Sequence, residues 1–290
     1  MSEKKKIFIG QSVLNIILFI VAFTMFFPFF YLLLVSFTDP AAFKPGQLNF
    51  WPEKWSLAAY NYILSGGGFV NAFKSTIIIT VIGTPLNVLF NSGLAYLLSK
   101  KGVPGRSVLM KLVIFTMLFS AGMIPGYLNI LRLGLYNSWL ACILPGTCSA
   151  WNLMVMKSFF QGLPGELEEA AIIDGCNELQ IFFKIILPLS KAMLATFTLF
   201  AAVGYWNCYF SAIMYLSDST KWPLQVFLQQ IVMSLNFDQF MDTGLELVSN
   251  VPQEVAQMAC IIVAVLPIMC VYPFLQKHFA KGVMVGSVKG

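Results

Sequence analysis

The chain has 290 residues, of which 58% are hydrophobic and 11% are charged, and its formal net charge is +5. One soluble core of this length does not normally bury so many apolar side chains, so the composition excludes an ordinary soluble domain and favours a protein that lies in lipid. The positive charge is concentrated in alternate predicted loops, a pattern that indicates membrane topology and not nucleic-acid binding.

Six segments are apolar enough, and close enough to the roughly 20 residues required, to cross the hydrocarbon layer as helices. Their approximate bounds are Gln11–Ser36, Val70–Leu98, Ser107–Pro125, Asn137–Met156, Ala192–Leu216 and Val255–Leu275. The second segment is interrupted by Ser, Thr and Asn residues and is expected to face other helices and not lipid. The sequence therefore predicts an all-α integral membrane protein with one transmembrane domain over residues 1–290.

The distribution of Lys and Arg predicts the orientation, because positive charge is retained on the cytoplasmic side. Thirteen of the 18 Lys and Arg residues fall in the loops that would share a side with both termini, so both termini are expected to be cytoplasmic. The basic start MSEKKK could indicate a secretory signal. The apolar stretch after it is too long and lacks a small-x-small cleavage site, which favours a retained first helix.

Neither a catalytic nor a metal site is indicated by the sequence. The six cysteines have no CxxC or paired spacing and are expected to be small buried packing residues, and His278 is the single histidine. A glycine-rich GxxxxGK[ST] loop, which would hold the phosphates of a nucleotide, is absent from the sequence. The chain is thus expected not to be an enzyme and to bind no cofactor itself.

The long loop at residues 157–191, predicted to be cytoplasmic, has a pattern typical of two short helices. Pro164 can occupy the first turn of the first helix, where three glutamates follow it, and Gly175 suits a left-handed residue that ends it. Asn177 and Gln180 resemble a capping box that opens the second helix. Five residues are expected to form one apolar face on that helix: Leu179, Phe182, Phe183, Ile186 and Leu187.

Ala170 and Ala171 leave little side-chain bulk on the first of these helices, so the helix pair is compact enough to enter a groove on another protein. An amphipathic pair that rests on the lipid surface explains the periodicity equally well. The residues alone leave both interpretations open.

The string EAAIIDG, from Glu169 to Gly175, is followed by Phe182, Ile185 and Leu187-Pro188. This pattern resembles the EAA loop in permease subunits of binding-protein-dependent ABC importers. The resemblance implies a type I ABC importer permease fold of six transmembrane helices, in which the loop forms a coupling helix that docks into a cleft on an ATPase subunit.

The resemblance also implies roles for individual residues of this loop. Glu169 is expected to be the polar contact to the ATPase, and Ala170 and Ala171 are expected to permit its close approach. Gly175 is expected to set the corner between the two helices. Two flanking residues, Glu168 and Asp174, are expected to share the polar contacts.

Other strings, including SFTDPAAF, TMLFSAGMIP, LRLGLYNSW and GYWNCYFSAIMYLSD, resemble carbohydrate-uptake permeases similar to the second membrane subunit of the maltose importer. Within them the chain is most similar to the branch that serves complex oligosaccharides. This resemblance implies a bacterial cytoplasmic-membrane protein with a sister permease, an extracellular binding protein and two ATPase subunits that use ATP and Mg. In such relatives the tail, here Gly282–Gly290, reaches toward the ATPase interface, although a disordered terminus is equally consistent with the sequence.

Sugars are held by aromatic faces and by amide or hydroxyl groups, which selects six candidates on the fifth and second predicted spans. These are Tyr205, Trp206, Asn207, Tyr209, Asn87 and Asn91. The same side chains could instead hold helices together, and in maltose-type relatives the sister subunit makes most of the sugar contacts.

Two other functions are consistent with a chain of this kind. One is a permease of the same fold for a solute other than a sugar. The other is an ion-coupled secondary transporter, which usually keeps an acid or histidine within the membrane. All 13 acidic residues here fall in predicted loops or at the end of a span, which disfavours ion coupling.

Overall fold

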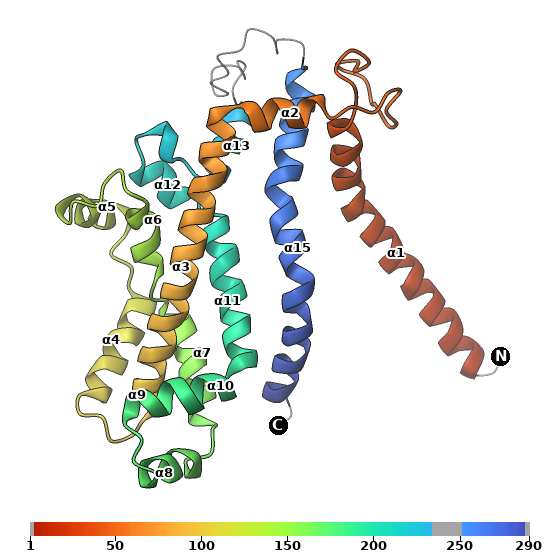
Figure 1. The fold of residues 1–290 in the computed structure, drawn as a ribbon. Helices are drawn as coiled ribbons and strands as arrows, with labels where there is room; N and C mark the ends of the chain where they lie inside the picture. The colour runs from red at the N-terminus through yellow and green to blue at the C-terminus, as the bar shows by residue number, and fades with distance from the viewer. Residues whose placement is uncertain (1–2, 234–250, 288–290) are drawn as a thin grey trace. The chain divides into compact units, whose positions relative to one another are not determined.

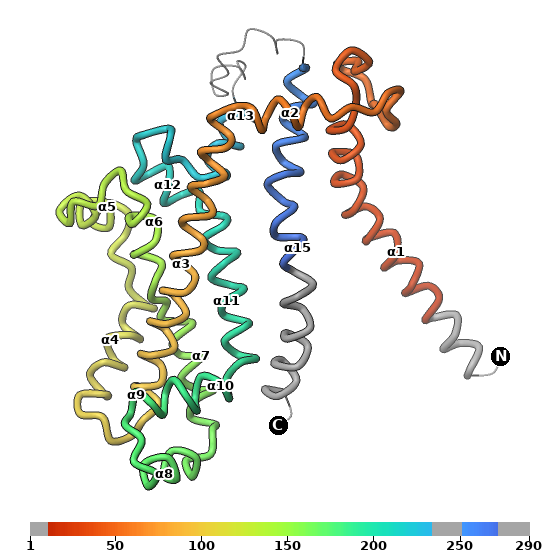
Figure 2. Tube along the Cα trace, in the orientation of Figure 1, coloured from red at the N-terminus to blue at the C-terminus, as the bar shows by residue number. Residues whose placement is uncertain are grey.

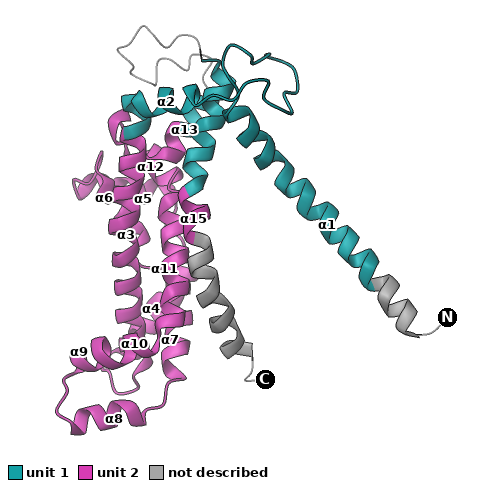
Figure 3. Cartoon of the chain, turned by 45° about the vertical axis from the view of Figure 1, so that its right-hand side comes forward, with its two compact units in different colours: residues 1–70, 228–266 teal, residues 71–227, 267–290 magenta. Residues whose placement is uncertain are grey.

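The structure, a computed structural model, describes the backbone of residues 3–233 and 251–287 and the side chains of residues 11–233 and 251–271. Over these ranges all the regular secondary structure is helical, which confirms the predicted all-α class. The described residues also contain one isolated β-bridge, between Thr38 and Trp55. The chain divides into two compact units, Met1–Val70 with Leu228–Leu266 and Asn71–Phe227 with Pro267–Gly290 (Figure 3).

The first unit contains α1, α2 and parts of three further helices. Their bounds are α1 Glu3–Ser36, α2 Ala58–Ser65, α3 Gly67–Ser99, α13 Leu224–Met233 and α15 Gln253–Ser287. The Ser36 hydroxyl lies 2.7 Å from the Tyr60 hydroxyl, which joins the end of α1 to α2. The side chains in the apolar window of α1 are all unburied within the chain, so this helix offers its whole apolar surface to lipid or another subunit.

The second unit contains most of α3 and the remaining helices. Their bounds are α4 Arg106–Leu118, α5 Met123–Arg132, α6 Trp139–Ile143, α7 Ala150–Gln161, α8 Glu166–Ile173, α9 Glu178–Ile181, α10 Leu187–Leu189, α11 Lys191–Trp206 and α12 Phe210–Tyr215. Helix α7 packs against both α4 and α11. At one end of this bundle lie α8, α9 and α10, and at the other end lie α5, α6 and α12 (Figure 1).

Three helices of the described chain are long and apolar enough to cross a membrane: Gln11–Ser36, Gly67–Ser99 and Gln253–Val271. They confirm the first, second and sixth predicted spans as long apolar helices. If each of two bent helix pairs is counted as one span, the number in the described residues rises to five.

The other predicted spans are wrong as continuous helices. The third, Ser107–Pro125, breaks between α4 and α5, where Gly122 has φ +84° and ψ 176°, a conformation that suits glycine. Helix α4 alone has 13 residues, which corresponds to about 20 Å and does not span the hydrocarbon layer.

The fourth and fifth predicted spans are broken as well. The fourth, Asn137–Met156, bends by 45° between Trp139–Gly146 and Ala150–Gln161. The fifth, Ala192–Leu216, ends as a helix at Trp206 and resumes as α12. Hydropathy detects the apolar composition of these segments but not their breaks.

The polar side chains of α3 are buried, as the sequence predicts for a helix that faces other helices. Ser75, Thr76, Asn87, Asn91 and Ser92 all lie below a tenth of their full exposure. The Thr76 hydroxyl accepts a hydrogen bond from the backbone N–H of Leu224 at 2.7 Å, which joins α3 to the start of α13.

The structure also bears on the predictions for the cysteines and for the C-terminal tail. Among the cysteines, Cys142 and Cys260 are buried as expected, but Cys148 and Cys270 are exposed. Helix α15 continues through the predicted tail as far as Ser287, while residues 288–290, and residues 234–250 between the fifth and sixth predicted spans, lie outside the described part of the chain.

Candidate functional site

The long loop between α7 and α11 folds into two short helices, as predicted (Figure 2). Helix α8 begins at Glu166, directly after Gly165, and its first turn holds Glu166, Glu168 and Glu169. Negative charge at a helix N-terminus is favoured by the helix dipole. Helix α8 is capped at its C-terminal end by Asp174, and Gly175 follows with φ +78°, the left-handed residue that the sequence predicts.

The predicted capping box opens the second helix. The Gln180 backbone N–H donates to the Asn177 side chain at 2.9 Å, and the Asn177 backbone N–H donates to the Gln180 side chain, also at 2.9 Å. This reciprocal pair fixes the chain direction directly after the Gly175 corner.

The two faces of α8 have opposite surroundings. Ala171 is 4% exposed and packs into the core of the second unit. Glu169, Ala170 and Ile173 lie on the other face, at helical spacing, and all are exposed, with Ile173 at 86%. Of the alanine pair, Ala170 is therefore placed to meet a partner surface, whereas Ala171 holds the helix to its own chain.

Helix α8 is held in place by a core made from the ends of four other elements. It contains Ala95, Tyr96, Leu98, Leu153, Met156, Phe160, Ala171, Ile181, Phe182, Ile186, Met193 and Phe197. The Tyr96 ring stacks on Phe182 at 5.2 Å between centroids and meets Phe160 edge-on at 5.9 Å. The helix pair is thus a packed part of the bundle and not a loose amphipathic segment.

The predicted apolar face of the second helix is correct only in part. Phe182 and Ile186 are buried, but Leu179 is 69% exposed and Phe183 is 51% exposed. A π-helical turn at Phe182–Ile186 changes the spacing of side chains along this helix, and such turns are frequent at functional sites. The exposed Leu179 and Phe183 enlarge the apolar surface that the loop presents.

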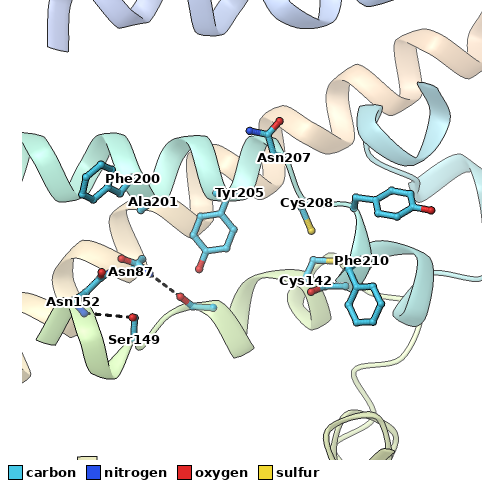
Figure 4. Close-up of a pocket in the computed structure, with 14 residues that line it drawn as sticks. Asn87, Cys142, Ser149, Asn152, Phe200, Ala201, Tyr205, Asn207, Cys208 and Phe210 are labelled. Atoms are coloured by element: carbon cyan, nitrogen blue, oxygen red, sulfur yellow. Dashed lines mark hydrogen bonds between the residues drawn. The ribbon is translucent and has the colours of Figure 1, made fainter. Parts of the chain in front are cut away.

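A pocket of about 490 Å³ lies in the second unit, between α3, α6, α7, α11 and α12 (Figure 4). Its lining is aromatic, amide, hydroxyl and thiol in character. The lining residues are Asn87, Cys142, Gly146, Ser149, Asn152, Phe200, Ala201, Gly204, Tyr205, Asn207, Cys208, Tyr209, Phe210 and Ser211.

Among the six candidates for sugar contact, Tyr205 has the most firmly held side chain. Its hydroxyl donates to the Ile143 carbonyl oxygen at 3.0 Å, at the end of α6. Its ring covers Gly83 of α3 so closely that a Cβ built there would lie 2.8 Å from ring carbons. The side chain is 7% exposed, so it forms a rigid wall of the pocket.

The two asparagines of α3 differ in their roles. Asn87 lines the pocket and donates to the Gly146 carbonyl oxygen at 2.7 Å. Asn91 does not belong to the lining. It is fully buried, donates to the Thr147 carbonyl oxygen at 2.9 Å and accepts from the Ser149 N–H at 3.0 Å. Asn91 thus satisfies the backbone groups that the break before α7 leaves unpaired.

The remaining candidates lie at the end of α11. Asn207 and Tyr209 belong to the pocket lining, and the Asn207 side chain accepts a hydrogen bond from Gln225 at 3.0 Å. Trp206 is absent from the lining and packs edge-on against Phe73 at 6.0 Å. Four of the six candidates, Asn87 and the three at 205, 207 and 209, therefore meet at one pocket, and Trp206 holds helices together.

Several lining residues were not predicted from the sequence. Ser149 caps the N-terminus of α7, where its hydroxyl accepts a hydrogen bond from the backbone N–H of Asn152 (Figure 4). Cys142 of α6 and Cys208, just after the end of α11, also line the pocket. The feature that could have indicated these lining residues is the pair of helix breaks in the fourth and fifth predicted spans. Irregular backbone at membrane depth is tolerated only where it is buried in protein or lines a water-filled cavity.

The pocket has no formally charged side chain among the lining residues that the structure describes. Within the described chain there is also no group of three or more His, Cys, Asp or Glu residues arranged to hold a metal ion. Recognition there would depend on hydrogen bonds and on stacking against aromatic rings.

Apolar helices of spanning length, a neutral pocket among broken helices and a packed loop with an exposed apolar surface define a helical membrane transport subunit. Residues 7–285 match the family described as "Binding-protein-dependent transport system inner membrane component", and the chain belongs to this family. The predicted resemblance to ABC importer permeases is confirmed.

Two relatives from Bacillus subtilis (strain 168) are each 47% identical to this chain. Protein LplC aligns over 264 residues, which cover 91% of this chain and 89% of LplC. The polygalacturonan/rhamnogalacturonan transport system permease protein YtcP aligns over 263 residues, which cover 91% of this chain and 92% of YtcP.

A solved structure of a bacterial ABC transporter involved in the import of the acidic polysaccharide alginate is also similar. The TM-score is 0.87 at 35% sequence identity, and the match covers 96% of this chain and 99% of that chain. The fold is therefore that of an ABC importer permease.

Proposed function

We propose that this permease conducts an oligosaccharide derived from a complex polysaccharide, delivered by an extracellular binding protein. The neutral pocket supports this proposal, because Tyr205 and Tyr209 offer aromatic faces and Asn87 and Asn207 offer amides. The relatives named for polygalacturonan, rhamnogalacturonan and alginate support the same class of cargo.

The surface that binds the ATPase is proposed to be the outer face of α8 with the start of the second helix. The observation that carries this proposal is the exposure of Ile173 at 86% beside the exposed Glu169 and Ala170. Leu179 of the second helix is also exposed, at 69%, and a surface with several exposed apolar side chains is typical of a protein interface. In this assignment Glu168 and Asp174 flank the contact and Gly175 sets its corner.

The rest of the assembly follows from the same proposal. The chain pairs with a sister permease in a heterodimer, in a bacterial cytoplasmic membrane, with both of its termini in the cytoplasm. Two ATPase subunits bind and hydrolyse ATP with Mg, and this chain takes no part in that chemistry. Residues 1–290 act as one permease domain that crosses the membrane six times, with the broken segments counted as spans.

The test of the cargo is a reconstituted assembly. The chain would be co-expressed with its sister permease, ATPase and binding protein, and ATP hydrolysis would be measured over a panel of neutral and acidic oligosaccharides. Stimulation by one class of oligosaccharide is expected. Stimulation only by solutes other than sugars would refute the cargo, and uptake abolished by an uncoupler but not by ATP depletion would refute the ABC mechanism.

The test of the docking surface is charge reversal at Glu169. Glu169→Lys is expected to lower ATPase co-purification and transport together, because it places a cation where the proposed contact needs an anion. Glu53→Lys is the control, since Glu53 is a mostly exposed acid in another loop, paired only with exposed Lys44. Full ATPase binding and transport by Glu169→Lys would contradict the assignment.

A further inference from the structure

Lys100, directly after the end of α3, holds both helices of the cytoplasmic loop. Its ammonium nitrogen lies 3.3 Å from a carboxylate oxygen of Glu168 on α8 and hydrogen-bonds Glu178 on α9. The nitrogen also lies 4.6 Å from the centroid of the Tyr96 ring. The side chains of Lys100 and Glu168 are 20% and 28% exposed, so this ion pair is better shielded from water than ordinary surface pairs, whereas Glu178 is 67% exposed.

The surroundings of Lys100 favour its charged form. Burial alone would lower the pKa of Lys100, but its hydrogen bond to Glu178 and the nearby charge of Glu168 outweigh burial and raise the pKa above its ordinary value. The helix dipole adds in the same direction, because a cation is favoured at the C-terminal end of α3. Lys100 is therefore positively charged at physiological pH.

Lys100 connects three helices: α3, which it directly follows, and α8 and α9, whose glutamates it contacts. Glu168 and Glu178 lie on opposite sides of the Gly175 corner, so one cation holds the two helices of the loop together and fastens both to α3. Arg106 strengthens the same end of α3, since its Nε donates to the Leu98 carbonyl oxygen at 2.8 Å.

Helix α3 connects this point to the pocket. Asn87, which lines the pocket, is 13 residues before Lys100 on a helix that continues to Ser99, a separation of about 20 Å. Asn91 and Asn87 fasten α3 to the break before α7, and Gly83 fits against Tyr205. A shift of α3 along its axis would therefore move two walls of the pocket.

We propose that Lys100 is the positioning residue through which movement of the cytoplasmic loop is transmitted to α3 and from there to the pocket. The proposal rests on the proposed function of the loop as the ATPase contact. The apolar contact of Tyr96 with Phe182 and Phe160 is non-directional and permits sliding. The ion pair with Glu168 on α8 and the charge-assisted hydrogen bond to Glu178 on α9 restrain distance and orientation, so they transmit force in both directions.

The test is the number of oligosaccharide molecules transported per ATP hydrolysed by the reconstituted assembly. Lys100→Gln is expected to leave ATPase co-purification intact while transport per ATP falls about fivefold or more. Lys100→Arg, which keeps the charge and can pair with both carboxylates, is expected to restore most of the coupling. Lys101→Gln is the matched control, because Lys101 is the exposed neighbour and is in no ion pair among the described residues.

A double-mutant cycle tests the proposed connection itself. Glu178→Gln is expected to lower transport per ATP, and adding it to Lys100→Gln is expected to cause little further loss, since both remove the same interaction. Unchanged coupling in Lys100→Gln overturns the inference. A parallel loss of ATPase co-purification also overturns it, because Lys100 would then merely hold the docking surface in shape.

Failure of the inference is distinguishable from failure of the proposed function. If the unsubstituted assembly does not transport oligosaccharide with ATP, the proposed function fails. If that assembly transports normally and Lys100→Gln matches it, the docking surface and cargo stand and only the role of Lys100 is refuted.

Discussion

Gly83→Ala is the sharpest structural test of the pocket, because Gly83 packs against the Tyr205 ring, which is itself held by a hydrogen bond. An alanine Cβ at this position would lie 2.8 Å from carbons of the Tyr205 ring. The ring cannot retreat easily, since the Tyr205 hydroxyl is bonded to Ile143 at 3.0 Å and lies 3.2 Å from where a Cβ on Gly146 would be.

The expected change in the free energy of unfolding for Gly83→Ala is the balance of two opposing effects. Overpacking of a filled core costs about 1–3 kcal/mol, and replacing glycine by alanine within a helix stabilises by about 0.5–1 kcal/mol. Gly93→Ala is the matched control, because Gly93 lies in the same helix and a Cβ there would meet nothing within 4 Å. Gly83→Ala is therefore expected to be less stable than Gly93→Ala by about 1–3 kcal/mol.

The assay is thermal unfolding of the detergent-solubilised assembly, combined with sugar-stimulated ATP hydrolysis. Gly83→Ala should lower the unfolding temperature relative to Gly93→Ala. Adding Tyr205→Ala should remove the difference between the two glycine variants, because it removes the ring that clashes. Equal stability of the two single variants would refute the close packing of Tyr205 on α3.

Three further predictions concern separate parts of the structure. Asn91→Leu should destabilise the chain by about 1–3 kcal/mol in the same unfolding assay, because it removes the hydrogen-bond partner of the part-buried Thr147 carbonyl and Ser149 N–H. Gly175→Ala should destabilise by about 1 kcal/mol through its positive φ alone, whereas Gly165→Ala, at an ordinary φ, should be neutral, and equal effects would contradict this reasoning. The raised pKa of Lys100 means that its ion pairs are fully formed below its ordinary pKa and are lost only as the pH rises above that value. Transport per ATP should therefore be flat between about pH 7 and pH 9, and a decline in that interval that Lys100→Arg abolishes would contradict this.

The loop between α7 and α11 could be predicted in detail because its signals are local. A capping box, a glycine in a left-handed conformation and acids in a first turn depend on a few adjacent residues, and the structure has each of them. The first, second and sixth spans were predictable for a similar reason, since each is a continuous helix that is long and apolar enough to cross a membrane.

The pocket could be predicted only in part, because it depends on where helices break. Gly122, Thr147 and Asn207 mark breaks inside apolar segments, and a hydropathy window averages over them. The inward direction of Ala171 and the π-helical turn after Phe182 depend on packing against α3 and α7, which the periodicity of one loop does not encode.

The breaks and the long helix α3 have complementary roles in a transport subunit. The broken segments place backbone and small polar groups of Gly146, Ser149 and Asn207 around a pocket that continuous helices would fill with apolar side chains. Such breaks leave unpaired backbone groups, and α3 satisfies those before α7 through Asn87 and Asn91. Because α3 is itself continuous from Gly67 to Ser99, a displacement at its Lys100 end cannot be absorbed by a hinge before it reaches those asparagines. Helix α3, which carries these buried polar side chains, is thus the element best suited to connect movement of the loop between α7 and α11 with the shape of the pocket.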